Sequence, residues 1–142
     1  MKTIILFRHG KSDWNAHFED DHDRPINKRG TNAAKKMGKH LSDRREIPQL
    51  LISSTALRAR ETIELAAQSG NWNSECIFEP RIYGGSPNVL IEIIKNINEK
   101  FNSVCLIGHE PNFSSFISRS CNEKHHRFPT ASMAKIVYNK DK

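Results

Sequence analysis

The chain has 142 residues, of which 37% are hydrophobic and 27% charged, a composition typical of a globular protein rather than a disordered one. It contains no run of about 20 apolar residues, so we expect no membrane span. The net charge of +6 favours acidic partners, either phosphorylated substrates or nucleic acid. Because the basic residues are scattered along the chain, we do not expect nucleic-acid binding.

The first half of the chain alternates apolar runs with helical patterns. Residues 3–7 predict a buried strand, and this run is too short for a signal peptide, so we expect a cytoplasmic protein. The polar residues 8–29 predict a long loop, in which Asp23 and Arg24 are candidates to pair. Helical spacing predicts a helix over 31–45 with Thr31 as N-cap, then a strand over 49–53 and a helix over 56–68 closed by Gly70.

The second half continues the same alternation. A short strand is predicted over 76–78, and Ser86-Pro87 is a strong helix start for a helix reaching residue 97. Strands over 103–107 and 134–138 follow, with a helix between them that ends near residue 120. The pattern predicts an α/β fold, a three-layer arrangement with a largely parallel central sheet flanked by helices, in one domain over residues 1–142.

The three cysteines are odd in number and widely spaced, which argues against a disulfide framework. Cys76 and Cys105 stand in apolar strand-like runs, so we expect both in the core. Cys121 could be combined with His125 and His126 as metal ligands, but no second ligand pair stands at a suitable spacing. We therefore expect no metal site.

Polar motifs follow three of the predicted strands. Arg8-His9-Gly10 follows the first strand, Ser53-Ser54 and Arg58 follow the second, and Gly108-His109 follows the fourth. In open α/β sheets, ligand sites form outside the carboxyl ends of the strands, so we expect these side chains to share one pocket. The remaining histidines are expected on the surface: His17, His22, His40, His125 and His126.

This set of residues suits phosphoryl chemistry. A guanidinium presents a planar fork that matches phosphate oxygens, and stabilising the charge on those oxygens is most of the catalysis. A neutral histidine can attack phosphorus, and its usual pKa of about 6.5 makes the neutral form available near pH 7. Repulsion from Arg8 and Arg58 should favour that neutral form further.

The whole chain resembles a known family. Residues 6–14, which contain Arg8-His9-Gly10, are similar to the opening of the histidine phosphatase superfamily, which includes the phosphoglycerate mutases. Four further segments resemble the compact SixA-like phosphohistidine phosphatases, in the family's order: residues 23–30, 53–62, 107–112 and 128–130. The resemblance implies a phosphoglycerate mutase-like fold and no metal cofactor.

The resemblance also implies roles by matching position. His9 would be the phosphorylated nucleophile, Arg8 and Arg58 would hold the phosphate, and His109 would bind phosphate and assist the transition state. Ser12 and Asn15 resemble accessory phosphate contacts. The chain departs from larger members at Gly84, where the alignment expects a proton-donating glutamate. Glu79 is nearby, but it stands two positions before Arg81, on the side of the predicted strand, and not at the matching place. No residue is therefore assigned as the general acid.

The implied substrate is phosphohistidine on a phosphorelay-type protein, such as a histidine-containing phosphotransfer domain. A small-molecule phosphomonoesterase of the same superfamily is the alternative within enzymes. A nonenzymatic phosphate- or nucleic-acid-binding domain is the rival from another class, and it predicts a damaged set of histidines and arginines. Both histidines and both arginines are present in this chain.

Overall fold

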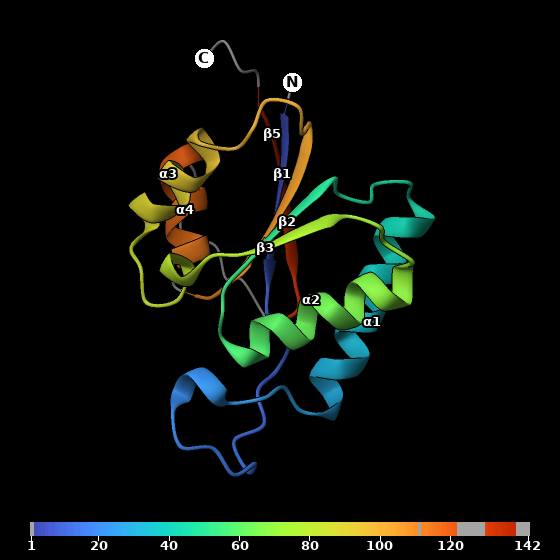
Figure 1. The fold of residues 1–142 in the computed structure, drawn as a ribbon, viewed down its shortest axis with the longest axis vertical. Coiled ribbons are helices and arrows are strands. Elements are labelled where there is room, and N and C mark those ends of the chain that lie inside the picture. Colours follow the sequence, from blue (N-terminus) through green and yellow to red (C-terminus); the bar gives the residue numbers. More distant parts are fainter. Residues whose placement is uncertain (1, 111, 122–129, 139–142) are drawn as a thin grey trace.

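The computed structural model of the chain describes residues 2–110, 112–121 and 130–138 (Figure 1). Strands and helices alternate within these residues in the predicted order. Two short 3₁₀ turns, over Asp21–Asp23 and Pro80–Ile82, accompany nine longer elements: β1 (Lys2–Arg8), α1 (Lys28–Asp43), β2 (Leu50–Ser53), α2 (Leu57–Gly70), β3 (Glu75–Phe78), α3 (Pro87–Lys95), β4 (Ser103–Gly108), α4 (Asn112–Cys121) and β5 (Met133–Tyr138).

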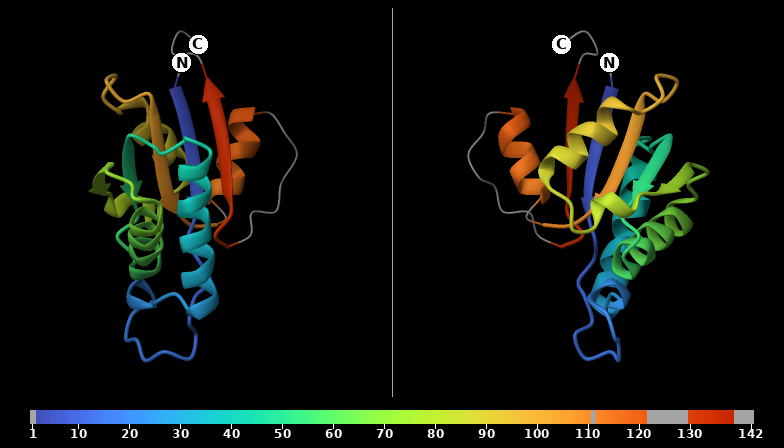
Figure 2. Two further views of the ribbon diagram at one scale, coloured as in Figure 1. Left: turned by 90° about the vertical axis from the view of Figure 1, so that its right-hand side faces the viewer. Right: turned by 60° about the vertical axis from the view of Figure 1, so that its left-hand side comes forward.

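The strands form one sheet in the order β3-β2-β4-β1-β5. β3, β2, β4 and β1 are mutually parallel, and β5 joins the edge beside β1 in the antiparallel direction. The opposed arrows of β1 and β5 are visible in Figure 2. The prediction of a largely parallel sheet is confirmed, and the carboxyl ends of its four parallel strands lie at the end of the molecule that carries the long loop (Figure 1).

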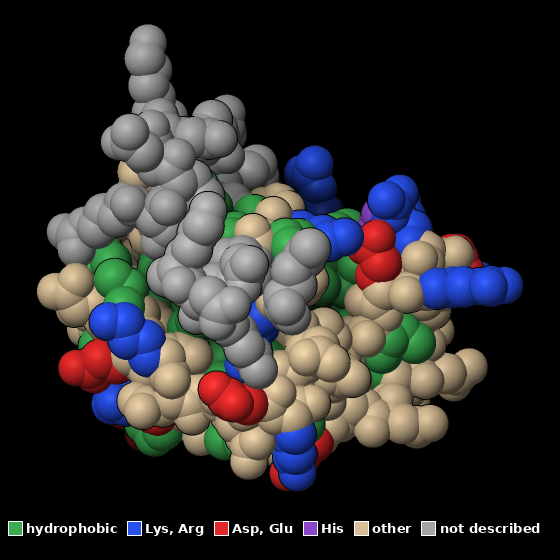
Figure 3. Space-filling view, turned by 90° about the horizontal axis from the view of Figure 1, so that it is seen from above, with side chains coloured by type: hydrophobic (Ala, Val, Ile, Leu, Met, Phe, Trp, Pro, Cys, Tyr) green, Lys and Arg blue, Asp and Glu red, His purple; other side chains and the backbone are tan. Residues whose placement is uncertain are grey.

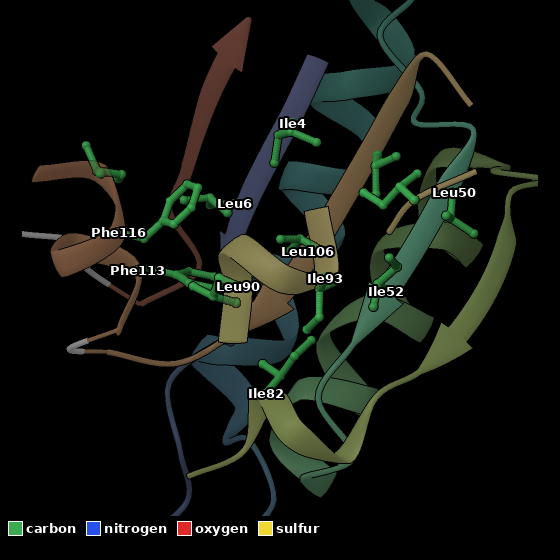
Figure 4. Close-up of a cluster of buried hydrophobic side chains, with 13 residues drawn as sticks. Ile4, Leu6, Leu50, Ile52, Ile82, Leu90, Ile93, Leu106, Phe113 and Phe116 are labelled. Atoms are coloured by element: carbon green, nitrogen blue, oxygen red, sulfur yellow. The ribbon is translucent and has the colours of Figure 1, made fainter. Parts of the chain in front are cut away.

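Helices cover both faces of the sheet. α1 and α2 lie on one face, whereas α3 and α4 lie on the other (Figures 1 and 2). Side chains alternate along β1, so that Ile4 and Leu6 join one hydrophobic cluster and Ile5 and Phe7 join the other. Figure 4 shows the cluster under α3 and α4. Full burial of an aliphatic or aromatic side chain contributes about 1.5–3 kcal/mol, so the strands are held firmly between the two helical layers.

The two helices on one face approach each other closely at Gly38 of α1. A Cβ atom at this position would lie 2.1 Å from the carbonyl oxygen of Ala66 in α2. The indole Nε1–H of Trp72 donates to the carbonyl of Gly38 from the same side, over 3.1 Å. The absence of a side chain at Gly38 therefore sets the distance between α1 and α2.

Two helix caps differ from the prediction. α1 begins at Lys28 because Asn27, rather than Thr31, is the N-cap: its side-chain oxygen accepts from the backbone N–H of Gly30 over 2.8 Å. α2 ends on Asn71 in the left-handed conformation, with φ 55°, and Gly70 is the last helical residue. An asparagine takes the place of the predicted cap at both ends, through its side chain at Asn27 and through its backbone conformation at Asn71.

The two cysteines whose side chains are described have different environments. Cys105 lies on β4 in the middle of the sheet and is fully buried, as predicted. The prediction for Cys76 is wrong, because β3 is an edge strand and all four of its residues are exposed. The apolar residues of β3 indicated a strand correctly, but its place in the sheet decided the burial.

The end of the molecule opposite the long loop is seen from above in Figure 3. Where this view shows coloured side chains, blue lysine and arginine side chains lie among red acidic ones around the rim. Within the described residues of this face, the basic groups form no single patch of the kind that tracks a nucleic-acid backbone. No helix among the described residues has the length and apolar character needed to cross a membrane.

Candidate functional site

Two histidines meet at the carboxyl ends of neighbouring strands. β1 and β4 pair in parallel with Arg8 opposite Gly108, so His9 and His109 leave the sheet side by side. The backbone N–H of His9 donates to the carbonyl of Gly108 over 3.1 Å. The two imidazole centroids lie 5.1 Å apart with their planes at 53°. The strand register thus brings together two side chains that are 100 positions apart in the sequence.

The His9 ring is held in one tautomer. Its Nδ1 lies 2.7 Å from the carbonyl oxygen of Gly10, which only accepts hydrogen bonds, so Nδ1 carries the proton. Burial lowers the pKa of His9 to about 4, against the opposing effect of the Gly10 bond and with help from the charges of Arg58 and Arg8. The predicted repulsion is present, although burial is the larger cause. A neutral His9 ring therefore keeps a lone pair on Nε2.

His109 is also held neutral. Its Nε2 lies 2.8 Å from the hydroxyl oxygen of Ser54, which follows β2. Burial lowers the pKa of His109 to about 3, helped by the repulsion that a second protonated ring would meet from His9 and by the charge of Arg58. Its Nδ1 is buried and has no hydrogen-bond partner among the described residues. A buried ring nitrogen without a partner indicates that a ligand or water is its partner in use.

The predicted arginines stand beside these rings. Arg8 is the last residue of β1, and Arg58 lies in the first turn of α2 with only 6% of its surface exposed. α2 is fixed to the end of β1, because Thr62 accepts the backbone N–H of Gly10 over 2.8 Å. The charges of both arginines act on the His9 ring and help to lower its pKa. The four predicted residues therefore form one cationic cluster.

The two accessory candidates lie on the long loop. Ser12 is buried at its base, where its backbone forms an isolated bridge with Ile26. Asn15 is exposed, and its backbone N–H donates to the carboxylate of Asp13. Among the described residues, no hydrogen bond or ion pair joins Asn15 to the cluster. A phosphate role for either residue stays a prediction.

Sequence reasoning missed Arg24 and Asp21 as members of the site. The predicted pair of Asp23 with Arg24 is wrong: Arg24 Nη1 lies 2.8 Å from Oδ1 of Asp21, and Asp23 lies near His22 instead. Arg24 is 7% exposed, and its guanidinium carbon sits 3.6 Å from the centre of the Trp14 ring. Its charge also lowers the pKa of His9. The only available signal was the resemblance of residues 23–30 to the family.

A row of rings borders the cluster. The Tyr83 ring lies edge-on to His109, with centroids 5.6 Å apart, and edge-on to His22, with centroids 4.9 Å apart. His22, predicted as a surface residue, is half-buried and its Nε2 lies 2.9 Å from the Thr55 hydroxyl. The side chain of His22 is still 36% exposed, so the surface expectation holds in part, but these contacts with Tyr83 and Thr55 were not expected and arise because the loop folds back over the start of α2.

The environments of Glu79 and Gly84 bear on which residue could act as the general acid. Both carboxylate oxygens of Glu79 accept hydrogen bonds from Arg81, which lower the pKa of Glu79. A carboxyl held ionised in this way is a poor proton donor near neutral pH. Gly84 has φ 77°, and a Cβ placed on it would meet no atom within 4 Å. Space for a larger side chain exists there, but the backbone conformation favours glycine.

The described residues contain no group of three or more histidine, cysteine or acidic side chains arranged to hold a metal ion. The candidate set of Cys121, His125 and His126 lies outside the described side chains, as do residues 128 and 129 of the last family-like segment. The described cluster is rich in guanidinium and imidazole groups, which suit an anion rather than a cation.

Comparison with known proteins gives one family. Residues 4–83 match the model of the histidine phosphatase superfamily, branch 1. An uncharacterised chloroplastic protein of Arabidopsis thaliana is 33% identical over 117 residues, which cover 76% of this chain and 54% of that protein. The chain spans between half and two-thirds of the length of the first curated relatives that it matches.

Solved structures share the fold. A protein of Agrobacterium tumefaciens described as the phosphohistidine phosphatase SixA superposes with a TM-score of 0.87 at 28% identity, covering 94% of this chain and 90% of its own. A protein histidine phosphatase SixA complexed with tungstate superposes with a TM-score of 0.88 at 22% identity, over 98% and 90% of the two chains. At that lower identity the second likeness shows the fold alone.

Proposed function

The chain belongs to the histidine phosphatase superfamily and is SixA-like, and from this premise we propose that it is a phosphatase that hydrolyses phosphohistidine on a protein. The observation that carries the proposal is the state of His9, a buried neutral ring whose Nδ1 is held by Gly10 and whose Nε2 keeps its lone pair. That is the state a histidine nucleophile needs. Residues 1–142 act in this proposal as one catalytic domain.

The reaction has two steps. Nε2 of His9 attacks phosphorus, a P–N bond to His9 forms, and the P–N bond to the substrate imidazole breaks. If the other nitrogen of the substrate ring is already protonated, that ring leaves neutral. Water then attacks the phosphorus on His9, which releases inorganic phosphate and a proton and restores the ring.

The cationic cluster stabilises the charge that develops on the phosphoryl oxygens. Arg8 and Arg58 offer guanidinium donors beside His9. The buried Nδ1 of His109, which has no partner among the described residues, is available to bind a phosphoryl oxygen as well. Since a neutral imidazole carries one proton, His109 donates from Nδ1 when Ser54 donates to its Nε2. These groups perform the stabilising role without a metal ion, and we propose that the enzyme is metal-independent.

The proposal is tested by turnover on a phosphorylated histidine-containing phosphotransfer domain beside a panel of small phosphomonoesters. We expect the phosphoprotein to be hydrolysed fastest, and acid-labile, base-stable phosphate to be trapped on His9. His9→Ala should lose nearly all turnover, whereas His17→Ala, which changes an exposed histidine of the long loop, should not. Faster hydrolysis of a phosphomonoester would favour the small-molecule phosphatase, and phosphate binding without turnover would favour a nonenzymatic domain.

A further inference from the structure

Asp21 joins two arginines of the cluster at their outer ends. Its Oδ1 lies 2.8 Å from Nη1 of Arg24, and its Oδ2 lies 3.0 Å from Nη2 of Arg58. The backbone carbonyl of Asp21 accepts a further bond from Nη1 of Arg58 over 2.8 Å. The Tyr83 hydroxyl donates to Oδ2 over 2.9 Å. One residue thus holds both guanidiniums by their terminal nitrogens.

The inner nitrogens of the same arginines are unused. Nε of Arg24 and Nε of Arg58 are buried, and neither has a hydrogen-bond partner within the described part of the chain. The side chain of Asp21, in contrast, is 48% exposed, whereas the side chains of Arg24 and Arg58 are 7–8% exposed, so Asp21 lies on their solvent side. Buried N–H groups without partners are costly, so an oxyanion that accepted hydrogen bonds from these groups would be bound favourably.

Charge gives the physical reason for a carboxylate at this place. Burial lowers the pKa of Arg24, and the like charge of Arg58 lowers it further, because the two guanidiniums repel each other. The Asp21 carboxylate attracts both guanidiniums and so offsets this repulsion. The hydrogen bond from Tyr83 and the charges of Arg58 and Arg24 outweigh burial and keep the pKa of Asp21 low, so the carboxylate is ionised.

We propose that Asp21 is a positioning residue, which clamps the outer ends of Arg24 and Arg58 and so aims their Nε–H groups at the phosphoryl group of the substrate. This inference deepens the proposed function and rests on it, because it takes the pocket to be a phosphoryl site. Asp21 touches the arginines and not the reacting atoms. A phosphate bound inside would complete a favourable alternation of charge, with the arginines between two anions.

A competing hypothesis predicts the opposite change in phosphate affinity. If Asp21 instead occupied the place of the phosphate, removing its charge would free the arginines and tighten anion binding. Simple electrostatics also predicts tighter anion binding when any negative charge near the site is removed. Weaker binding after neutralisation of Asp21 is therefore expected only from the positioning role.

The test is inorganic phosphate binding to the full chain, measured by calorimetry. We expect Asp21→Asn to raise the Kd for phosphate about tenfold, at the lower end of the loss that follows removal of an outer carboxylate that orients a ligand-holding side chain. Asp20→Asn makes the same charge change on the neighbouring exposed residue, whose side chain makes no capping bond, and it should stay within about twofold of the wild type. An unchanged or lower Kd for Asp21→Asn overturns the proposal.

Two further measurements separate positioning from stability. In nuclear magnetic resonance spectra, the Nε–H signals of Arg24 and Arg58 should shift on phosphate addition in the wild type and should saturate at about tenfold higher phosphate in Asp21→Asn. A residue that only stabilised the fold would lower Tm and leave this titration unchanged. If Asp21→Asn fails to fold, Tyr83→Phe removes one donor to the carboxylate and should weaken phosphate binding in the same direction.

Binding of phosphate needs no turnover, so the two proposals fail separately. Loss of phosphohistidine hydrolysis in a wild type that binds phosphate would overturn the proposed function alone. Hydrolysis that proceeds while Asp21→Asn binds phosphate as well as the wild type would overturn the role of Asp21 alone. A wild type that binds no phosphate would overturn both.

Discussion

Acidification from pH 7 to pH 5 should destabilise the fold through His9 and His109. Burial lowers their folded-state pKa values to about 4 and about 3, whereas a histidine in an unfolded chain has a pKa of about 6.5. Between pH 7 and pH 5 the unfolded chain therefore takes up protons on these rings and the folded protein does not. Because the unfolded state binds more protons, the free energy of unfolding falls as the pH falls through 6.5.

The size of the effect follows from the same pKa values. At pH 5 an imidazole with a pKa of about 6.5 is almost fully protonated, which stabilises the unfolded state by about 2 kcal/mol for each ring relative to pH 7. The two rings together account for about 4 kcal/mol, a large part of a typical total of about 5–15 kcal/mol. The pKa values of Asp21 and Glu79 are lowered, so the stability lost when these carboxyls are protonated is lost below pH 5, outside the range of the experiment.

The assay is urea unfolding at pH 7 and pH 5, followed by circular dichroism. In His9→Asn/His109→Gln the amide groups keep donors near Gly10 and Ser54 but do not titrate, so this variant should lose about 4 kcal/mol less than the wild type on acidification. His40→Gln, which removes an exposed histidine of α1, is the control and should retain the wild-type loss. An equal loss in the double variant and the wild type would refute the assignment of acid sensitivity to the site.

Three further predictions concern the site and the fold. Activity should survive extensive chelation and vanadate should inhibit it; loss of activity in chelator, restored by one metal, would contradict the mechanism. The wild type should hydrolyse phosphohistidine fastest, aryl phosphates next and alkyl phosphates far more slowly, and a flat dependence of rate on the leaving group would count against this. Gly84→Glu should selectively raise alkyl-phosphate turnover and lower the free energy of unfolding by about 1 kcal/mol, because residue 84 has a left-handed backbone. Gly38→Ala should lower the free energy of unfolding by roughly 1–3 kcal/mol in urea melts, because its Cβ would overlap the Ala66 carbonyl, and a neutral result would show that α1 and α2 can separate.

The clustering of the candidate site residues was predictable because the signals for it are local. Three of the apolar runs of strand length are followed by a polar motif, as His9 follows β1 and His109 follows β4. Parallel strands end at one edge of a sheet, so the four residues could be assigned to one pocket before any coordinates. The neutral state of His9 was also expected, although its main cause is burial, which only the fold supplies.

The sequence by itself determined the order of the elements, the mainly parallel sheet and the pairing of two histidines with two arginines, because these depend on apolar periodicity and on motifs next to strand ends. Only the tertiary structure decided that β3 is an exposed edge and that Asp21 meets Arg58, 37 positions away, and Tyr83, 62 positions away. The partner of a carboxylate is set by where a long loop folds back, and several acids in that loop carry the same charge. Their side chains become distinguishable only when the loop packs against the start of α2 and the turn that contains Tyr83.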